Sequence, residues 1–385
     1  MTGRVVVNTD LNFVQGLMLH GAADLKKCYQ CSTCTVACPL TPNDQPFPRK
    51  EMLWAQWGMK DKLFRDMDLW LCHNCNDCTD QCPRGAKPGE VMSALRNQTI
   101  EHYSYPQAIS KAAKSARGNV VLFLIPMVLI ALAIAMKNIE SGFAFLTAKP
   151  IVYANMLPVN FIDILFLPPV LFAVFNSYKA ISNFIGGLKE QYPPTDRGEN
   201  LLPAVKGTIQ DVLSHIEFKK CGTNKSRNIS HRLMMYGFIG LFITTNAVFV
   251  LHWLNEFGFD VQVTPLPFFH PVKILGNVSA FAAFAGIYLI VRDRVKNSAT
   301  SILSLFDWMF IGNMFFTVVT GILCQVFRVG DHANLAFLTY YIHLVMVFYL
   351  LAYAPQTKFG HILYRPAAMI YSRYSGRNID IFRNL

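Results

Sequence analysis

Eight of the ten cysteines form two copies of one short motif. The first copy is Cys28-YQ-Cys31-ST-Cys34-TVA-Cys38-Pro39, and the second is Cys72-HN-Cys75-ND-Cys78-TDQ-Cys82-Pro83. Both copies fit the pattern C-x2-C-x2-C-x3-C-P, which is typical of proteins that bind two [4Fe-4S] clusters. The sequence therefore predicts two [4Fe-4S] clusters, which transfer single electrons.

The spacing also predicts how the cysteines are shared. In this pattern three cysteines of one motif ligate one cluster, and the fourth, next to the proline, ligates the other cluster. The predicted ligands are Cys28, Cys31, Cys34 and Cys82 for one cluster, and Cys72, Cys75, Cys78 and Cys38 for the other. Structural zinc is the alternative, but it favours two separated C-x2-C pairs and leaves the third cysteine, the proline and the duplication unexplained. Cys221 and Cys324 have no such pattern, and we assign them no role.

The segments around the motifs predict a helical domain over residues 1–117. Between the motifs, PRKEMLWAQWGMKDKLF repeats apolar residues at helical spacing, and PGEVMSALRNQTI begins with a proline suited to a helix start. Charged residues are frequent up to Arg117, and long apolar runs begin at Gly118. We therefore expect an all-α protein with a two-cluster ferredoxin domain over 1–117 and a membrane domain over 118–385.

The second part of the chain is apolar enough to cross a membrane several times. The whole chain is 52% hydrophobic and only 15% charged, which excludes a single soluble domain. Runs free of charged residues are long enough for membrane helices, and a sixth run is interrupted only by Asp163. The six expected spans lie within 118–136, 150–178, 233–255, 274–291, 308–327 and 332–357.

The basic residues predict the orientation of these spans. The N-terminal segment MTGRVVVNTDLNF resembles no secretory signal, so we expect the N-terminal domain in the cytoplasm. The polar connection 182–230, the turn 292–296 and the C-terminal tail then face the cytoplasm as well. The segments 179–232, 292–296 and 358–385 hold 17 Lys and Arg residues, against four in the opposite loops. The net charge of +11 thus reflects topology, and we expect no nucleic-acid partner.

Histidines in the spans predict haem ligands, because ionisable residues inside a membrane are usually functional. His231 and His252 are about 31 Å apart along one helix, and His343 and His361 are five turns apart if their helix continues. Since these helices run antiparallel, we pair His231 with His361 at the cytoplasmic side and His252 with His343 at the outer side. Two haems follow. They are b-type because no C-x-x-C-H motif is present.

Other polar residues near the spans leave alternatives open. His270 and His332 are rival ligands at the outer side, or hydrogen-bond partners of a quinone. His20, His73, His102 and His215 are expected at the protein surface. The chain has no G-x-G-x-x-G, P-loop or H-E-x-x-H motif, so we expect no catalytic residue of its own. These observations indicate an electron conduit.

The paired motifs and PRGAKPGEVMSALR resemble the C subunit of heterodisulfide reductases (HdrC) over residues 20–110. HRLMMYGFIGLFITT and the 18-residue histidine spacing that ends in GHILYRP are similar to cytochrome b subunits of the nitrate reductase gamma type. The fusion resembles the C subunit of the quinone-interacting membrane-bound oxidoreductases (QmoC) of sulfate-reducing bacteria. That resemblance implies two [4Fe-4S] clusters, two haems b and menaquinol as substrate. It also implies HdrA-like flavoprotein partners of the QmoA and QmoB type, and electron transfer toward adenylylsulfate reductase in the bacterial cytoplasmic membrane.

Two other functions remain possible from the residues. One is the membrane subunit of a heterodisulfide reductase, in which the electrons end on a disulfide. The other is a membrane anchor that takes no part in electron transfer and holds an iron–sulfur partner in place.

In the nitrate reductase gamma type the two histidines of the helix that matches His231 and His252 lie closer together, so His252 departs from that pattern.

Overall fold

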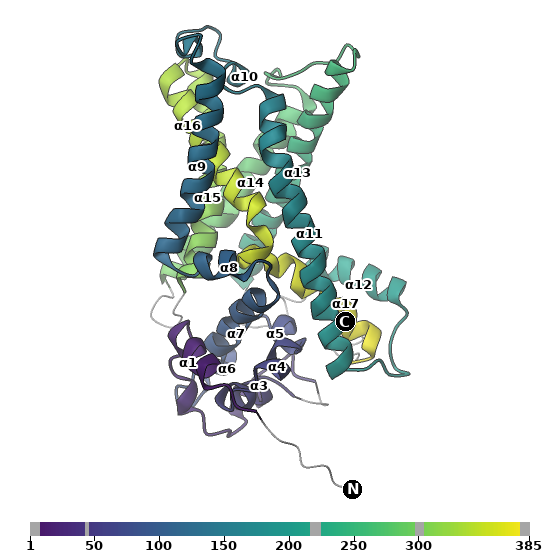
Figure 1. The fold of residues 1–385 in the computed structure, drawn as a ribbon. Coiled ribbons are helices and arrows are strands. Elements are labelled where there is room, and N and C mark those ends of the chain that lie inside the picture. The colour runs from purple at the N-terminus through teal and green to yellow at the C-terminus, as the bar shows by residue number, and fades with distance from the viewer. Residues whose placement is uncertain (1–7, 43–45, 216–224, 297–303, 378–385) are drawn as a thin grey trace.

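A computed structural model describes residues 8–42, 46–215, 225–296 and 304–377. These residues form helices and connecting turns, with no β-strand among them, which confirms the all-α fold. The long helices stand side by side, and the short helices of the cysteine-rich region lie at one end of them (Figure 1). Cys221 lies outside the described residues.

Six helices in the described chain are long and apolar enough to span a membrane, which confirms the expected number. They are α9 (Ala116–Asn138), α11 (Val159–Gln191), α13 (Lys225–Glu256), α14 (Pro271–Lys296), α15 (Leu305–Val329) and α16 (Ala333–Ala352). Many of their large apolar side chains are exposed on the outside of the bundle, as lipid-facing residues should be. Short segments, including α10 (Tyr153–Met156), connect them.

The cysteine-rich region is built from eight short helices around one core. They are α1 (Leu11–Leu19), α2 (Thr33–Val36), α3 (Arg49–Gln56), α4 (Lys60–Phe64), α5 (Asp68–Leu71), α6 (Asp77–Asp80), α7 (Pro88–Tyr103) and α8 (Gln107–Ala113). The longest of them, α7, begins with Pro88 and contacts α1, α3, α4, α5, α6 and α8. Its Met92 and Leu95 are fully buried with Leu17 and Met52, so α7 organises the core.

Small residues allow α13 and α14 to pack closely. A Cβ atom added at Gly237 of α13 would lie 2.5 Å from the backbone nitrogen of Ala283 in α14. A Cβ at Gly286 of α14 would lie 2.5 Å from the backbone nitrogen of Met234. Lipid is as apolar as the side chains of membrane helices, so burying these side chains does not drive the helices together. Membrane helices associate instead through close packing at small residues. The close packing on α14 fixes the position of α13, the helix that carries His231 and His252.

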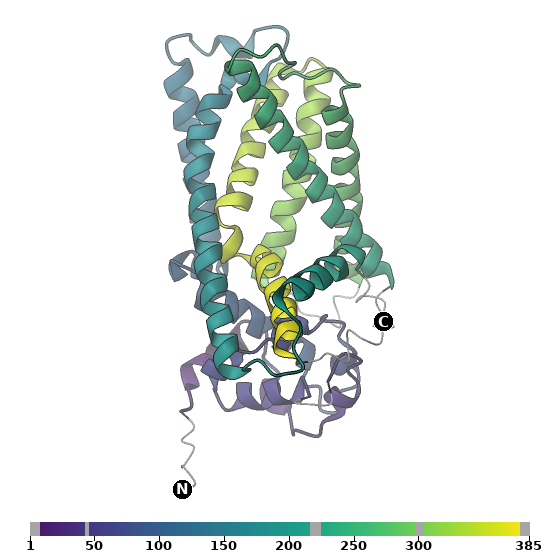
Figure 2. The same cartoon turned by 90° about the vertical axis from the view of Figure 1, so that its right-hand side faces the viewer.

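The helix that carries His343 does not continue to His361. α16 ends at Ala352, two 3-10 turns with Pro355 in the first of them follow, and a separate helix α17 (His361–Ser375) begins at His361. The five-turn spacing of the two histidines, which holds only if their helix continues, therefore does not apply. Pro355, which lacks the amide donor of a helix interior, lies three residues after the end of α16. Figure 2 shows this C-terminal segment bending away below α16.

The polar connection 182–230 is largely helical in its described part. α11 continues to Gln191, and α12 (Leu201–Ser214) packs against α17. Arg373 of α17 donates to Asp211 of α12 at 2.7 Å. The two helices lie beside the cysteine-rich region at the same end of the bundle (Figure 1).

A buried charged cluster joins the cysteine-rich region to the ends of α11 and α17. We call it the junction cluster; its members are Lys50, Glu51, Asp66, Asp68, Tyr192 and Arg377. Lys50 Nζ lies 2.5 Å from Asp68, 3.3 Å from Asp66 and 2.9 Å from the Tyr192 hydroxyl. Burial raises the pKa of the Glu51 carboxyl well above its usual range. Burial would raise the pKa of Asp66 as well, but the charge of Lys50 holds it below the usual value.

Candidate metal centres

The two cysteine motifs have the same local backbone. Gln30 and Ser32 of the first motif have positive φ, and so do Asn74 and Asn76 at the matching positions of the second. In each loop the amide of the second residue after the first cysteine points at that cysteine's sulfur, from Gln30 to Cys28 at 3.5 Å and from Asn74 to Cys72 at 3.4 Å. Amide groups that donate to sulfur stabilise thiolates and tune iron–sulfur clusters. Both loops are therefore shaped alike for the same kind of ligand.

The fold brings the fourth cysteine of each motif to the other motif. Cys28 interacts electrostatically with Cys31 of its own motif and with Cys82 of the second. Cys38 interacts in the same way with Cys72 and Cys75.

Burial raises the pKa of several of these thiols. It raises the pKa of Cys34 to about 11 and that of Cys38 to about 12. Such groups become thiolates at neutral pH only beside strong positive charge, which bound iron supplies. The residues present fit iron–sulfur clusters.

His231 and His361 are both arranged as metal ligands usually are. Nδ1 of His361 lies 2.7 Å from the carbonyl oxygen of Lys358, to which it can only donate. Nδ1 of His231 lies 2.8 Å from Nε2 of His215, whose own Nδ1 lies 3.4 Å from the Leu213 carbonyl. The tautomers that satisfy these contacts carry the ring proton on Nδ1 of both His231 and His361, so the lone pair is on Nε2. A ligating histidine typically donates its other ring proton in this way.

The two rings also belong to one neighbourhood. Among the titratable residues that act on His231, His361 has the strongest electrostatic interaction with it. Burial lowers the pKa of His361 to about 4, so its imidazole is neutral at pH 7, the form that binds metals. The donor set fits a haem iron bound by two imidazoles.

His215 is a residue that sequence reasoning missed. We expected four histidines at the surface, and this is right for His20 and His102 but wrong for His73 and His215, which are only 6% and 4% exposed. His215 lies at the end of α12, which packs on α17 and so buries the ring against His231. Only the fold-back of α12 creates this contact, and no local pattern in the sequence signals it.

The expected outer ligands have separate partners. Nε2 of His252 bonds to Asn160 Oδ1 of α11 at 3.0 Å, whereas Nδ1 of His343 lies 3.0 Å from the Thr320 hydroxyl of α15. In the described chain no hydrogen bond joins His252 to His343. His343 lies ten residues, or about 15 Å, from the start of α16, while His252 is four residues from the end of α13. The two side chains therefore differ in depth.

The rival histidines lie at helix starts. His332 precedes α16 and is exposed, and His270 precedes α14, where its Nδ1 accepts from the amide of Val272 at 3.3 Å. Neither contacts His343 or His252 through a hydrogen bond among the described residues.

α13 and α17 also contact the second cysteine motif. Nη1 of Arg227 donates to the carbonyl oxygen of Asn74 at 2.7 Å, and Nη1 of Arg365 approaches that of Cys72 at 3.4 Å. Each arginine is four residues from a histidine on the same helix, His231 or His361, so it lies one turn away. Trp70, two residues before the motif, stacks on Tyr364 of α17 at 4.9 Å between ring centroids. The motif and the histidine pair are thus tied to the same two helices.

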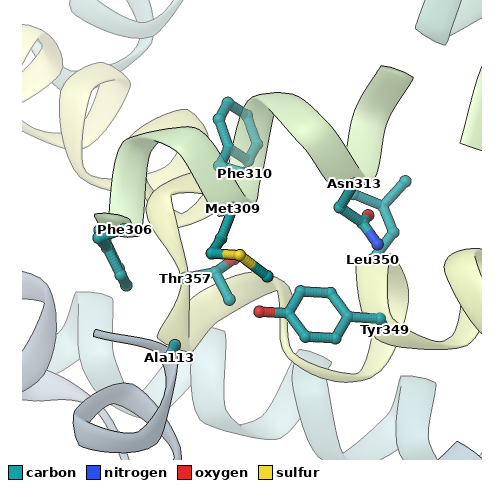
Figure 3. Close-up of a pocket in the computed structure, with 8 residues that line it drawn as sticks. All are labelled: Ala113, Phe306, Met309, Phe310, Asn313, Tyr349, Leu350 and Thr357. Atoms are coloured by element: carbon teal, nitrogen blue, oxygen red, sulfur yellow. The ribbon is translucent and has the colours of Figure 1, made fainter. Parts of the chain in front are cut away.

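A small apolar recess adjoins His361. Phe310, whose ring lies 5.9 Å from that of His361, lines it together with Asn313 and Tyr349 (Figure 3). The free space, with its open mouth included, is about 280 Å³. Because the enclosed part of this space has room for little more than one water molecule, we assign no ligand to it.

Comparison with known proteins identifies the cysteine-rich region. Residues 24–86 match the family of 4Fe-4S dicluster domains. The chain is 34% identical over 94 residues to the C subunit of the H2:CoB–CoM heterodisulfide,ferredoxin reductase of Methanothermobacter marburgensis, covering 24% of this chain and 51% of the relative. It is also 34% identical over 117 residues to a protein of Archaeoglobus profundus that is described as similar to the heterodisulfide reductase C subunit, covering 26% and 62%.

A longer but weaker similarity reaches another type of heterodisulfide reductase component. The chain is 22% identical over 176 residues to the E subunit of the dihydromethanophenazine:CoB–CoM heterodisulfide reductase of Methanosarcina acetivorans, covering 44% of this chain and 66% of the relative. The chain spans about half to two thirds of the length of these curated relatives. No solved structure matches it. The chain thus joins a 4Fe-4S dicluster domain, similar to that of heterodisulfide reductase subunits, to six helices of membrane type.

Proposed function

We propose that the chain is the membrane electron-transfer subunit of a quinone-linked respiratory complex. It moves electrons between menaquinol and a cytoplasmic flavin and iron–sulfur partner. The observation that carries this proposal is the pairing of His231 with His361 beside the second cysteine motif, with Nδ1 of each ring already hydrogen-bonded. When bound, haem b and the two [4Fe-4S] clusters supply one-electron chemistry.

The chain's own residues hold these groups in place. We propose the crossed cysteine sets as ligands of the two clusters, and His231 with His361 as ligands of the haem at the cytoplasmic side. His252 and His343 are the proposed ligands at the outer side, where His270 and His332 compete with them. The second haem requires Nε2 of His252 to release Asn160.

The proposed topology puts residues 1–117 and the C-terminus in the cytoplasm. α12, α17 and the cysteine-rich region lie at one end of the bundle (Figure 1), and α12 and α17 belong to the basic segments 179–232 and 358–385. The partners proposed there are HdrA-like subunits, with electrons passing toward adenylylsulfate reductase in sulfate respiration.

A second candidate is the membrane subunit of a heterodisulfide reductase. The similarity to the E subunit of the Methanosarcina acetivorans enzyme favours it, since that relative belongs to a heterodisulfide reductase. Both candidates use the same cofactors and differ in the terminal acceptor. Oxidation of a menaquinol analogue by the purified complex, measured with and without a disulfide acceptor, separates them.

The decisive test is an anaerobic spectrum of the purified protein, reduced minus oxidised, with haem and non-haem iron measured per chain. We expect two haems b and about eight non-haem irons. A content of one haem per chain would contradict the proposed role of His252 and His343 as ligands of a second haem. No haem would leave an iron–sulfur domain on a membrane anchor and contradict the proposed function.

Replacing His215 with alanine should weaken haem binding at the cytoplasmic side without removing the ligands themselves. The Nδ1 proton of His231 then loses its acceptor, and loss of such a partner lowers metal affinity by about 10- to 100-fold. His215→Gln offers a carbonyl oxygen in its place and should restore much of the affinity. Haem retention and midpoint potential are the measurements, with the exposed His20→Ala as control. Equal behaviour of His215→Ala and His20→Ala would contradict the assigned role.

A further inference from the structure

Three arginines interact electrostatically with the histidine pair, and a fourth, Arg294, interacts with one of these arginines. Arg227 of α13 interacts electrostatically with Arg96 of α7, Arg294 of α14 and Arg365 of α17. His361 interacts with Arg96 and Arg365, and His231 with Arg227 and Arg365. We call Arg96, Arg227, Arg294 and Arg365 the arginine cluster. Like charges gathered in a buried place repel each other unless an anion offsets them.

Among the described residues, the Cys75 thiol interacts electrostatically with Arg227, and two carboxylates interact with Arg294. Asp307 is the carboxylate that interacts with Arg294 from the start of α15, but its Oδ1 lies 2.7 Å from Nζ of Lys358. The other carboxylate near Arg294, Asp293, accepts two hydrogen bonds from Arg292. Both carboxylates are therefore already engaged by another cation.

Arg96 has buried hydrogen-bond donors that no described protein group satisfies. Its Nε and Nη2 atoms are buried and have no hydrogen-bond partner in the described structure. A guanidinium group presents these donors in a fixed fork that matches the two oxygens of a carboxylate. Leaving such donors unsatisfied costs free energy, so their burial beside His361 indicates a binding role.

We infer that the arginine cluster binds the two propionate carboxylates of the haem held by His231 and His361, with Arg96 as its principal donor. This inference rests on the proposed haem site. The histidines offer ligands for the iron, and the arginines offer donors for the only charged groups at the edge of a haem b. Arg227 contributes charge while its Nη1 stays on the Asn74 carbonyl, so it lies between the haem site and the second cysteine motif.

The location of Arg96 adds a second consequence. Arg96 belongs to α7, the central helix of the cysteine-rich region, whereas the other three arginines belong to the helices that follow. The carboxylate site is therefore complete only when the cysteine-rich region is docked on the bundle. Haem binding and docking should stabilise each other.

The test compares haem with its dimethyl ester, which keeps the iron and the ring but lacks carboxylates. Protein produced without haem is reconstituted with each compound, and the rate of haem transfer to apomyoglobin is measured. Wild-type protein should lose the ester at least about tenfold faster than haem, as expected for lost charge-assisted hydrogen bonds. Arg96→Gln should lose haem nearly as fast as wild type loses the ester, and Arg96→Lys should lie between.

Arg117→Gln is the control, because Arg117 is an exposed arginine near the start of α9 and does not belong to the arginine cluster. It should behave like wild type. A second readout is the haem midpoint potential, which should fall in Arg96→Gln because a nearby positive charge disfavours ferric iron. Iron content and cluster signals report whether each variant is folded.

The outcomes separate the two proposals. If wild-type protein takes up neither haem nor ester, the proposed function fails at this site. If it binds both with equal stability, or if Arg96→Gln matches Arg117→Gln, the haem stands and the inference about the arginine cluster is overturned.

Discussion

Replacing Cys38 with alanine is expected to remove the cluster of the second motif and to leave that of the first motif intact. The reason is the crossed arrangement, in which Cys38 interacts with Cys72 and Cys75 although it belongs to the first motif. Loss of one ligand in a buried site exposes the cluster to solvent and breaks its coordination. Non-haem iron should fall from about eight to about four per chain, and one of two cluster signals in electron paramagnetic resonance should disappear.

Cys82→Ala is the reciprocal variant and should remove the cluster of the first motif, because Cys82 interacts with Cys28. Cys324→Ala is the control, since this buried thiol lies in α15, far along the chain from both motifs. Selective Cys72→Ala and Cys28→Ala variants identify which signal belongs to which motif. If Cys38→Ala and Cys28→Ala lose the same signal, each motif binds its own cluster and the crossed assignment is wrong.

Replacing Lys50 with methionine should destabilise the protein by about 3 to 5 kcal/mol, the usual cost of removing one partner from a buried ion pair. Lys50 contacts three acidic side chains of the junction cluster, all fully buried. Without it, Asp66 loses its ion-pair partner and Asp68 keeps only Arg377. The measurement is the apparent melting temperature of the detergent-purified protein with its cofactors bound.

Lys27→Met is the matched control for this prediction. Lys27 is paired with Asp24 at 2.6 Å, but its side chain is 59% exposed, and such surface pairs contribute less than about 1 kcal/mol. Adding Asp66→Asn to Lys50→Met should recover part of the loss, because it removes the charge that was left alone. A melting temperature of Lys50→Met equal to that of Lys27→Met would show that the junction cluster does not stabilise the fold.

The sequence predicts the spans well because their signal is local. Runs without charged residues coincide with the six long helices, and the pattern needs no knowledge of what packs against them. The break after α16 is also signalled locally, by Pro355, although the histidine spacing favours a continuous helix.

Contacts between distant segments are beyond the reach of the sequence. Lys50, Asp66 and Asp68 are residue types usually found at surfaces, and only the fold buries them against Tyr192, which follows 142 residues after Lys50. Arg96 lies in the expected helix PGEVMSALRNQTI, and no local pattern there signals the arginine cluster. His215 acquires its partner only because α12 returns to α17. Local periodicity determines which segments form helices, but not which polar groups meet.

The docking of the cysteine-rich region has a consequence for how electrons move. Tyr192 at the end of α11, Arg227 on α13 and Tyr364 on α17 hold it at three separate points. A domain fixed in this way is not a tethered carrier that swings between donor and acceptor. In the proposed function, the spacing between its redox groups is therefore set when the chain folds, and electron transfer inside the protein does not wait for the domain to move.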